Sequence, residues 1–117
     1  MAMEHPKTFD ELTFMAGVKK RPGLFIGRKS LSTFRHFVNG MQWAFGYGNA
    51  ENGFVLLNEF VVWYQEHVVR DQNGYASAFN HLLYISAGDE ALAFDQFFRQ
   101  FESWLMEKHG ILLPTIV

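Results

Sequence analysis

Large apolar side chains recur every three or four residues through the last third of this 117-residue chain. At 100° per residue they fall on one face of a helix that begins after Asp89 and runs to about Lys108. That face consists of Phe94, Phe97, Phe98, Phe101, Trp104 and Leu105. Asp89 is a favoured N-cap residue and Gly110 is a favoured stop, so the pattern predicts both ends of the helix. On the opposite side, Asp95, Arg99 and Glu102 have the spacing of ion pairs along a helix.

A first helix is predicted from about Phe9 to Lys19. Thr8 and Glu11 match the capping box, in which each side chain accepts a hydrogen bond from the backbone N–H of the other residue. Pro22 and Gly23 then end the helix, because proline lacks the backbone N–H that a helix needs.

A second helix is predicted from a cap at Ser30 or Ser32 to about Phe45. Its apolar residues fall on one stripe that we expect to be buried: Leu31, Phe34, Phe37, Val38, Met41, Ala44 and Phe45. Trp43 projects from the opposite side of this helix, near His36 and Asn39.

The segment from about Phe54 to Val69 is apolar on nearly every side, which predicts a central helix packed on two faces. One face is Leu57, Phe60, Val61, Tyr64 and Val68, and the other is Val55, Val62 and Val69. The valines leave a short β-strand open at Phe54–Leu57. A shorter helix follows from about Tyr75 to Ser86, with Phe79, Leu82, Leu83 and Ile85 inward.

The basic run from Lys19 to Leu31 connects the first two helices. It contains Lys19, Lys20, Arg21, Arg28 and Lys29 around a Pro-Gly turn. We expect a fixed loop there, with Leu24, Phe25 and Ile26 tucked inward and the charges outside. A short β element at Leu24–Ile26 also stays open.

Five helices with short connections predict an all-α compact bundle, and the length predicts a single domain over residues 1–117. Thirteen phenylalanines supply the material for one core. Cysteine is absent, residues 1–7 lack the apolar stretch of a signal peptide, and no window of about 18 apolar residues suggests a membrane span. We therefore expect a cytoplasmic protein that does not enter membranes.

The sequence carries no motif for catalysis, metal binding or a cofactor. The five histidines have no partner at a recognised metal spacing, and no serine lies in a nucleophile-elbow context. Neighbouring acids such as Asp89 and Glu90 are explained by their position at a helix N-terminus. We expect a protein that is not an enzyme and has no small-molecule substrate.

Charge is distributed unevenly along the chain. Residues 1–58 hold seven Lys or Arg against four Asp or Glu, and residues 59–117 hold three against eight, so the balances are +3 and −5. The acidic half offers a docking surface for a basic partner. The candidate contact residues are Glu59, Glu66, Asp89, Glu90, Asp95 and Glu102, with Trp43 as an aromatic anchor.

Three motifs carry a family resemblance: the run Arg21–Leu31, the stretch Phe37–Gly40 and the aromatic stretch Ala93–Phe98. Together they resemble a group of small helical bacterial proteins encoded beside polymorphic or contact-dependent toxins. Such proteins are usually immunity proteins. The resemblance implies a protein that binds a cognate toxin and blocks its active site, and a nuclease toxin would suit an acidic inhibitor. The alternative is a small nucleic-acid-binding regulator that uses the five basic residues of the 19–29 loop.

Overall fold

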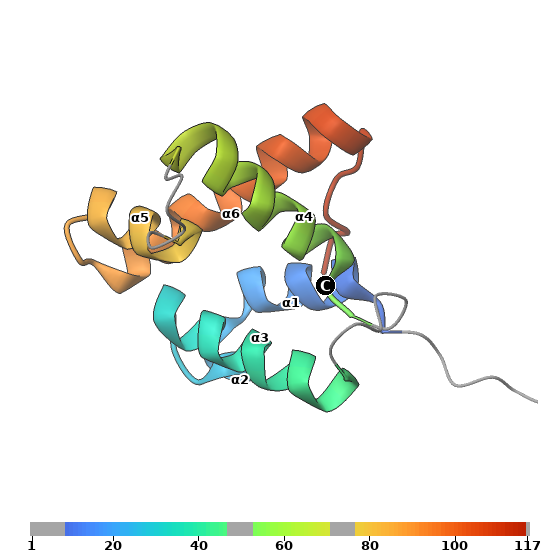
Figure 1. Cartoon of the computed structure of the whole chain (residues 1–117). Coiled ribbons are helices and arrows are strands. Elements are labelled where there is room, and N and C mark those ends of the chain that lie inside the picture. Colours follow the sequence, from blue (N-terminus) through green and yellow to red (C-terminus); the bar gives the residue numbers. More distant parts are fainter. Residues whose placement is uncertain (1–8, 47–52, 71–76, 117) are drawn as a thin grey trace, which may run out of the picture.

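The computed structural model describes residues 9–46, 53–70 and 77–116, and every regular element within these ranges is helical. The elements are α1 (Glu11–Lys20), α2 (Pro22–Ile26), α3 (Leu31–Phe45), α4 (Val55–Tyr64), a π-helical segment η2 (Gln65–Val69), α5 (Ala78–Ile85) and α6 (Glu90–His109). In Figure 1, α1, α2 and α3 lie together, and α4 and α6 cover them from one side. The predicted all-α bundle is confirmed. The strand alternatives at Leu24–Ile26 and Phe54–Leu57 are wrong, because both segments are helical.

The helix ends follow local chemistry. The side chains of Ser30, Ser77 and Asp89 cap α3, α5 and α6 by accepting a hydrogen bond from a backbone N–H three residues later. Gly110 ends α6 in the left-handed conformation, with φ of 65°, as glycine allows without strain. The caps predicted at Ser30 and Asp89 and the stop at Gly110 are therefore confirmed.

The predicted capping box at the start of α1 is wrong. Asp10 caps α1, and its carboxylate accepts hydrogen bonds from the Thr13 N–H and hydroxyl. Thr8 lies outside the described residues. The buried Glu11 carboxylate instead accepts from the backbone N–H groups of Leu56 and Leu57, at 2.9 and 2.7 Å. Because the N-cap residue of α4, Phe54, offers no side-chain acceptor, Glu11 of α1 caps α4.

The 22–26 segment is a single helical turn rather than a loop with an inward apolar plug. Ile26 is buried as expected, but Leu24 is 73% exposed and Phe25 is half-exposed. Successive residues of a helix point about 100° apart, so one turn cannot turn all three side chains inward. Phe25 lies across Gly17 of α1, so close that a Cβ at position 17 would be 2.9 Å from its ring.

Phe97 on α6 is the centre of the aromatic core. Its fully buried ring lies 5.2 Å from the ring of Phe34 on α3 and 5.7 Å from those of Phe60 on α4 and Phe79 on α5, measured between centroids. Such offset and edge-to-face contacts add to the hydrophobic gain from burial. One side chain of α6 therefore joins three other helices.

Several side chains predicted to lie inward on the outer helices are exposed. Val55 and Val62 of α4 are 47% and 53% exposed, so this helix packs on one face and not on two. On η2, Val68 of the first predicted face is exposed, whereas Val69 of the second packs against the core. Ile85, at the last turn of α5, is exposed as well. In the tail after α6, Ile111 and Leu113 pack against the core, whereas Leu112 between them is exposed. No helix in the described part of the chain has the length and apolar character needed to span a membrane.

Replacing Phe97 by alanine should lower the free energy of unfolding by about 3–5 kcal/mol, because the cavity would remove ring contacts to three helices. Urea denaturation measures the change. Leu92→Ala on the same helix is the matched control, since Leu92 is exposed, and its effect should stay within about 0.5 kcal/mol. Equal effects of the two substitutions would contradict the central role of Phe97.

Candidate functional site

The seven side chains predicted to bind a partner lie on four elements. Trp43 is on α3, Glu59 is on α4, and Glu66 is on η2. Asp89, Glu90, Asp95 and Glu102 lie at the start of α6 and along it. Their surroundings divide the six acids into three pairs, and Trp43 stands apart from them.

The two acids at the start of α6 serve the fold. Asp89 accepts from the Leu92 N–H at 3.0 Å as the N-cap of its own helix. Glu90 reaches α3, where its carboxylate accepts from the Ser32 N–H at 2.8 Å, the Ser32 hydroxyl at 2.7 Å and the Ser30 hydroxyl at 3.2 Å. Both carboxylates are therefore engaged in capping.

The contact of Glu90 with the start of α3 lowers the pKa of its carboxyl group. Burial alone would raise the pKa, but the donors on Ser32 and Ser30, together with the nearby positive charge of Arg28, hold it below the ordinary value of 4.5. The pKa of Glu11 shifts the other way, because burial raises it more than the Leu56 and Leu57 N–H groups lower it. Both glutamates therefore accept hydrogen bonds from another helix, but the pKa of Glu90 is lowered and the pKa of Glu11 is raised.

Two acids of α6 are neutralised by the basic run. Asp95 lies 2.7 Å from Lys29 Nζ, and Glu102 lies 2.7 Å from Lys19 Nζ. The predicted ion pairs of Asp95 and Glu102 with Arg99 are wrong, because the two acids turn to lysines of another segment. Since these lysines belong to the proposed nucleic-acid set, part of the acidic surface and part of the basic surface cancel each other.

The other basic candidates are also tied to their surroundings. Lys20 donates to the Ile116 carbonyl oxygen in the C-terminal tail. Arg28 is exposed, and its positive charge helps to lower the pKa of Glu90. Arg21, the N-cap residue of α2, also interacts with another group of the protein. A nucleic-acid surface built from these residues stays a prediction.

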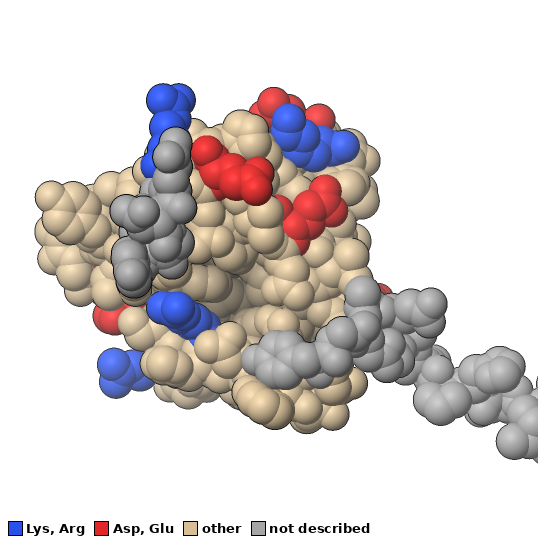
Figure 2. Space-filling model, viewed as in Figure 1, with Lys and Arg blue, Asp and Glu red and all other residues tan. Residues whose placement is uncertain are grey.

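The remaining acids lie on the outside of α4 and η2. Glu59 and Glu66 are both exposed, and the nearest partner is His109, whose Nε2 is 3.2 Å from Glu59. Figure 2 shows acidic side chains over α4 and the end of α6, with a basic side chain beside them at the upper right. These are the acids of the predicted set that neither cap a helix nor face a lysine.

Trp43 lies on a helical face without formal charge. The indole is 72% exposed, and residues 36–46 contain no Asp, Glu, Lys or Arg. The exposed side chains of this face are His36, Phe37, Asn39, Trp43 and Ala44, with Gly40 between them. The predicted buried stripe is too wide: Ala44 is exposed, and Phe37 is 39% exposed although one side of its ring stacks on Phe14 of α1.

A pair of side-chain amides links this face to α4. Gln42 of α3 and Asn58 of α4 exchange two hydrogen bonds of 3.4 Å. Gln42 precedes Trp43, and Asn58 precedes Glu59. The last turn of α3, which carries Trp43, is therefore in contact with the start of α4.

Sequence reasoning missed a half-buried polar pair between α4 and α5. The hydroxyl of the buried Tyr64 lies 2.8 Å from His81 Nδ1, and burial raises the pKa of this phenol. His81 is thus paired with a phenol rather than with a carboxylate. Only the place of Tyr64 on the inward face of its helix was visible in the sequence.

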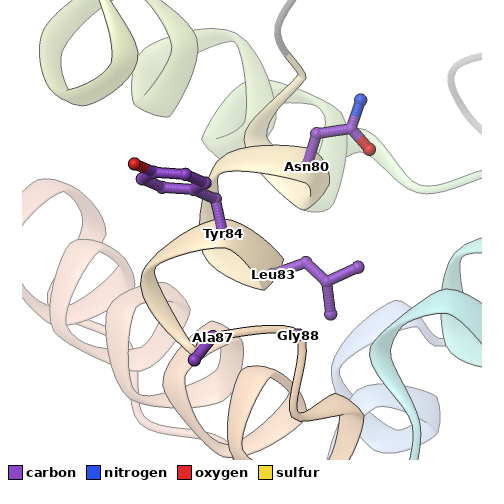
Figure 3. Close-up of a pocket in the computed structure, with 5 residues that line it drawn as sticks. All are labelled: Asn80, Leu83, Tyr84, Ala87 and Gly88. Atoms are coloured by element: carbon purple, nitrogen blue, oxygen red, sulfur yellow. The ribbon is translucent and has the colours of Figure 1, made fainter.

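An open hollow of about 460 Å³ lies at the turn between α5 and α6, lined by Asn80, Leu83, Tyr84, Ala87 and Gly88 (Figure 3). Asn80 accepts a hydrogen bond from Arg35 at 3.3 Å. An amide and a phenol are its polar side chains, so the lining offers no pair of groups for acid–base catalysis.

Within residues 9–46, 53–70 and 77–116, no three His, Asp or Glu side chains are grouped closely enough to hold a metal ion. Comparison of the chain with family models, curated proteins and solved structures found no match.

The two cross-helix glutamates should affect the pH dependence of stability in opposite directions. The contribution of Glu90 is present above its ordinary pKa of 4.5 and is lost as the pH falls through its lower folded pKa. Glu90→Gln should therefore lose less stability on acidification than the unsubstituted protein does.

Glu11 should show the reverse. Its folded pKa is raised, so its contribution is fully present below 4.5 and is lost as the pH rises through the folded value. Glu11→Gln should thus lose less stability between acid and neutral pH. Urea unfolding between about pH 3 and pH 7 measures both slopes, and slopes that change in the same direction would contradict the assignment.

Proposed function

We propose that this protein is an immunity protein that binds a cognate protein toxin, most simply a nuclease, and blocks its active site. The observation that carries the proposal is the exposed Trp43 on a helical face without Asp, Glu, Lys or Arg. The family resemblance of Arg21–Leu31, Phe37–Gly40 and Ala93–Phe98 supplies the class of partner.

The composition of the Trp43 face is that of a protein interface. The centres of such interfaces are depleted in charged residues and enriched in aromatic ones, and tryptophan is prominent among the residues whose loss weakens binding most. On α3 the apolar side that the fold requires is already supplied by Leu31, Phe34 and Val38, which are buried. Trp43, which is 72% exposed, is additional to it.

Inhibition by occlusion requires no catalytic group in the inhibitor. It requires a rigid surface, because flexible side chains lose entropy when they are immobilised on binding. The Trp43 face meets this requirement, since α3 is capped at its start by Ser30 and held there by Glu90. A partner would thus meet a helix that is already ordered.

The experiment is co-expression with the toxic product of the neighbouring gene, followed by affinity purification of the complex and a growth assay. We expect tight binding and rescue of growth. Absence of a complex and of rescue would overturn the proposed function.

Trp43→Ala should weaken the complex by about 30-fold or more, as expected when a central aromatic contact is lost. Tyr84→Ala is the matched control, because Tyr84 is an even more exposed aromatic residue on α5. Isothermal titration calorimetry measures both. If Tyr84→Ala weakened the complex and Trp43→Ala did not, the Trp43 face would not be the contact surface.

A further inference from the structure

Four exposed side chains form a ridge along the outside of α4 and the start of η2. Val55, Glu59, Val62 and Glu66 follow one another at intervals of four, three and four residues, so they lie on one line of the helix. The buried residues Leu57, Phe60 and Tyr64 are on the other side. This ridge alternates between an apolar side chain and a carboxylate.

The valines of the ridge do not serve the fold. Each is about half-exposed, and valine is a poorer helix former than alanine by up to about 0.7 kcal/mol. An exposed valine inside a helix therefore lowers helix stability and gains little from burial. Two of them on one line form a small apolar surface that the described part of the chain leaves in solvent.

The formal charges of the ridge have a single sign. Residues 54–69 contain no Lys or Arg, and the first basic residue after them is Arg70. Two imidazoles lie nearby: His109 of α6 contacts Glu59, and His67 of η2 stacks on Trp63 with centroids 5.4 Å apart. Asp95 and Glu102 on α6, by contrast, each face a lysine at 2.7 Å.

We propose that the α4 ridge is the docking surface for a basic segment of the partner protein, one that places lysine or arginine side chains on either side of an apolar contact. The charge pattern of the ridge selects that chemistry, because Val62 lies between Glu59 and Glu66, so cations that face the two carboxylates would flank an apolar side chain packed on Val62. This inference rests on the proposed function and deepens it, since it names the surface that recognises a basic segment of the toxin.

The first test uses the protein alone. The ¹⁵N-labelled chain is titrated with a short synthetic helical peptide that carries lysines on both sides of a leucine strip, and amide shifts are followed by NMR. We expect the largest shifts between Val55 and Glu66, decreasing as salt is added. Shifts centred on Asp95 and Glu102, or no shifts, would overturn the inference without touching the proposed function.

The second test uses the toxin complex and two charge-matched double variants. Glu59→Gln with Glu66→Gln removes two negative charges from the ridge, and Asp95→Asn with Glu102→Gln removes two from α6. The ridge variant should weaken binding by at least about tenfold and reduce its salt dependence, whereas the α6 variant should change it by less than about threefold. The opposite order would overturn the inference while the complex itself still supported the proposed function.

Val62→Arg tests the apolar part of the ridge. The arginine can pair with Glu66 four residues later, so the helix is kept while the ridge becomes basic in the middle. We expect weaker binding of both the peptide and the toxin. Self-association of the unsubstituted protein that Val62→Arg abolishes would overturn the proposal in favour of a second copy of this chain.

Discussion

The start of a packed helix must find acceptors for its first backbone N–H groups, and this requirement organises the whole fold. An unpaired buried N–H costs roughly 1–3 kcal/mol. The first turn of α4 has no cap of its own, so Glu11 of α1 supplies both oxygens to Leu56 and Leu57. Glu90 of α6 does the same for Ser32 of α3. Each glutamate joins two helices that are far apart in the sequence, and so fixes where one helix begins relative to the other.

The aromatic core then determines which faces are left outside. The ring of Phe97 on α6 packs against Phe34 of α3, Phe60 of α4 and Phe79 of α5. The buried side chains of α3, α4 and α5 pack toward α6, and the opposite faces of α3 and α4 are largely exposed. Their contacts with other helices include the stacking of Phe37 on Phe14 of α1 and the contact of Glu59 with His109 of α6. The Trp43 face and the α4 ridge are those opposite faces. Their exposure follows from the geometry of the core, while their composition does not.

The sequence predicts this fold well wherever the signal lies within one helix. The period of phenylalanines in α6, the caps at Ser30 and Asp89 and the stop at Gly110 depend on neighbours within a few residues. One failure is local, at the 22–26 segment, which forms a helical turn instead of a loop. Other failures involve partners from elsewhere in the chain. Glu11 and Glu90 were expected to act on their own helix ends and in fact cap other helices. Periodicity gives the direction of a side chain but does not say which helix lies there.

The candidate site illustrates the same limit through charge. A balance of +3 and −5 in the two halves suggested separate basic and acidic surfaces. In the folded chain Lys19 pairs with Glu102, and Lys29 pairs with Asp95. The charges of two candidate basic residues therefore cancel those of two candidate acidic residues. Exposed ion pairs of this kind add little stability. Because the two charges neutralise each other, however, neither attracts a charged partner strongly. The acids that remain are Glu59 on α4 and Glu66 on η2, two elements that contain no lysine or arginine.

Trp43 and Glu59 lie on two helices, α3 and α4, that are in direct contact. Gln42 and Asn58 exchange amide hydrogen bonds between α3 and α4, with Trp43 next to one and Glu59 next to the other. The amide pair therefore joins the last turn of α3, which carries Trp43, to the start of α4, the helix of the acidic ridge. Apolar contacts supply most of the affinity of a protein complex, and charges mainly set its selectivity and rate of association. In the proposed complex, the uncharged face of α3 would thus supply affinity, and the acidic ridge of α4 would supply selectivity for a basic partner.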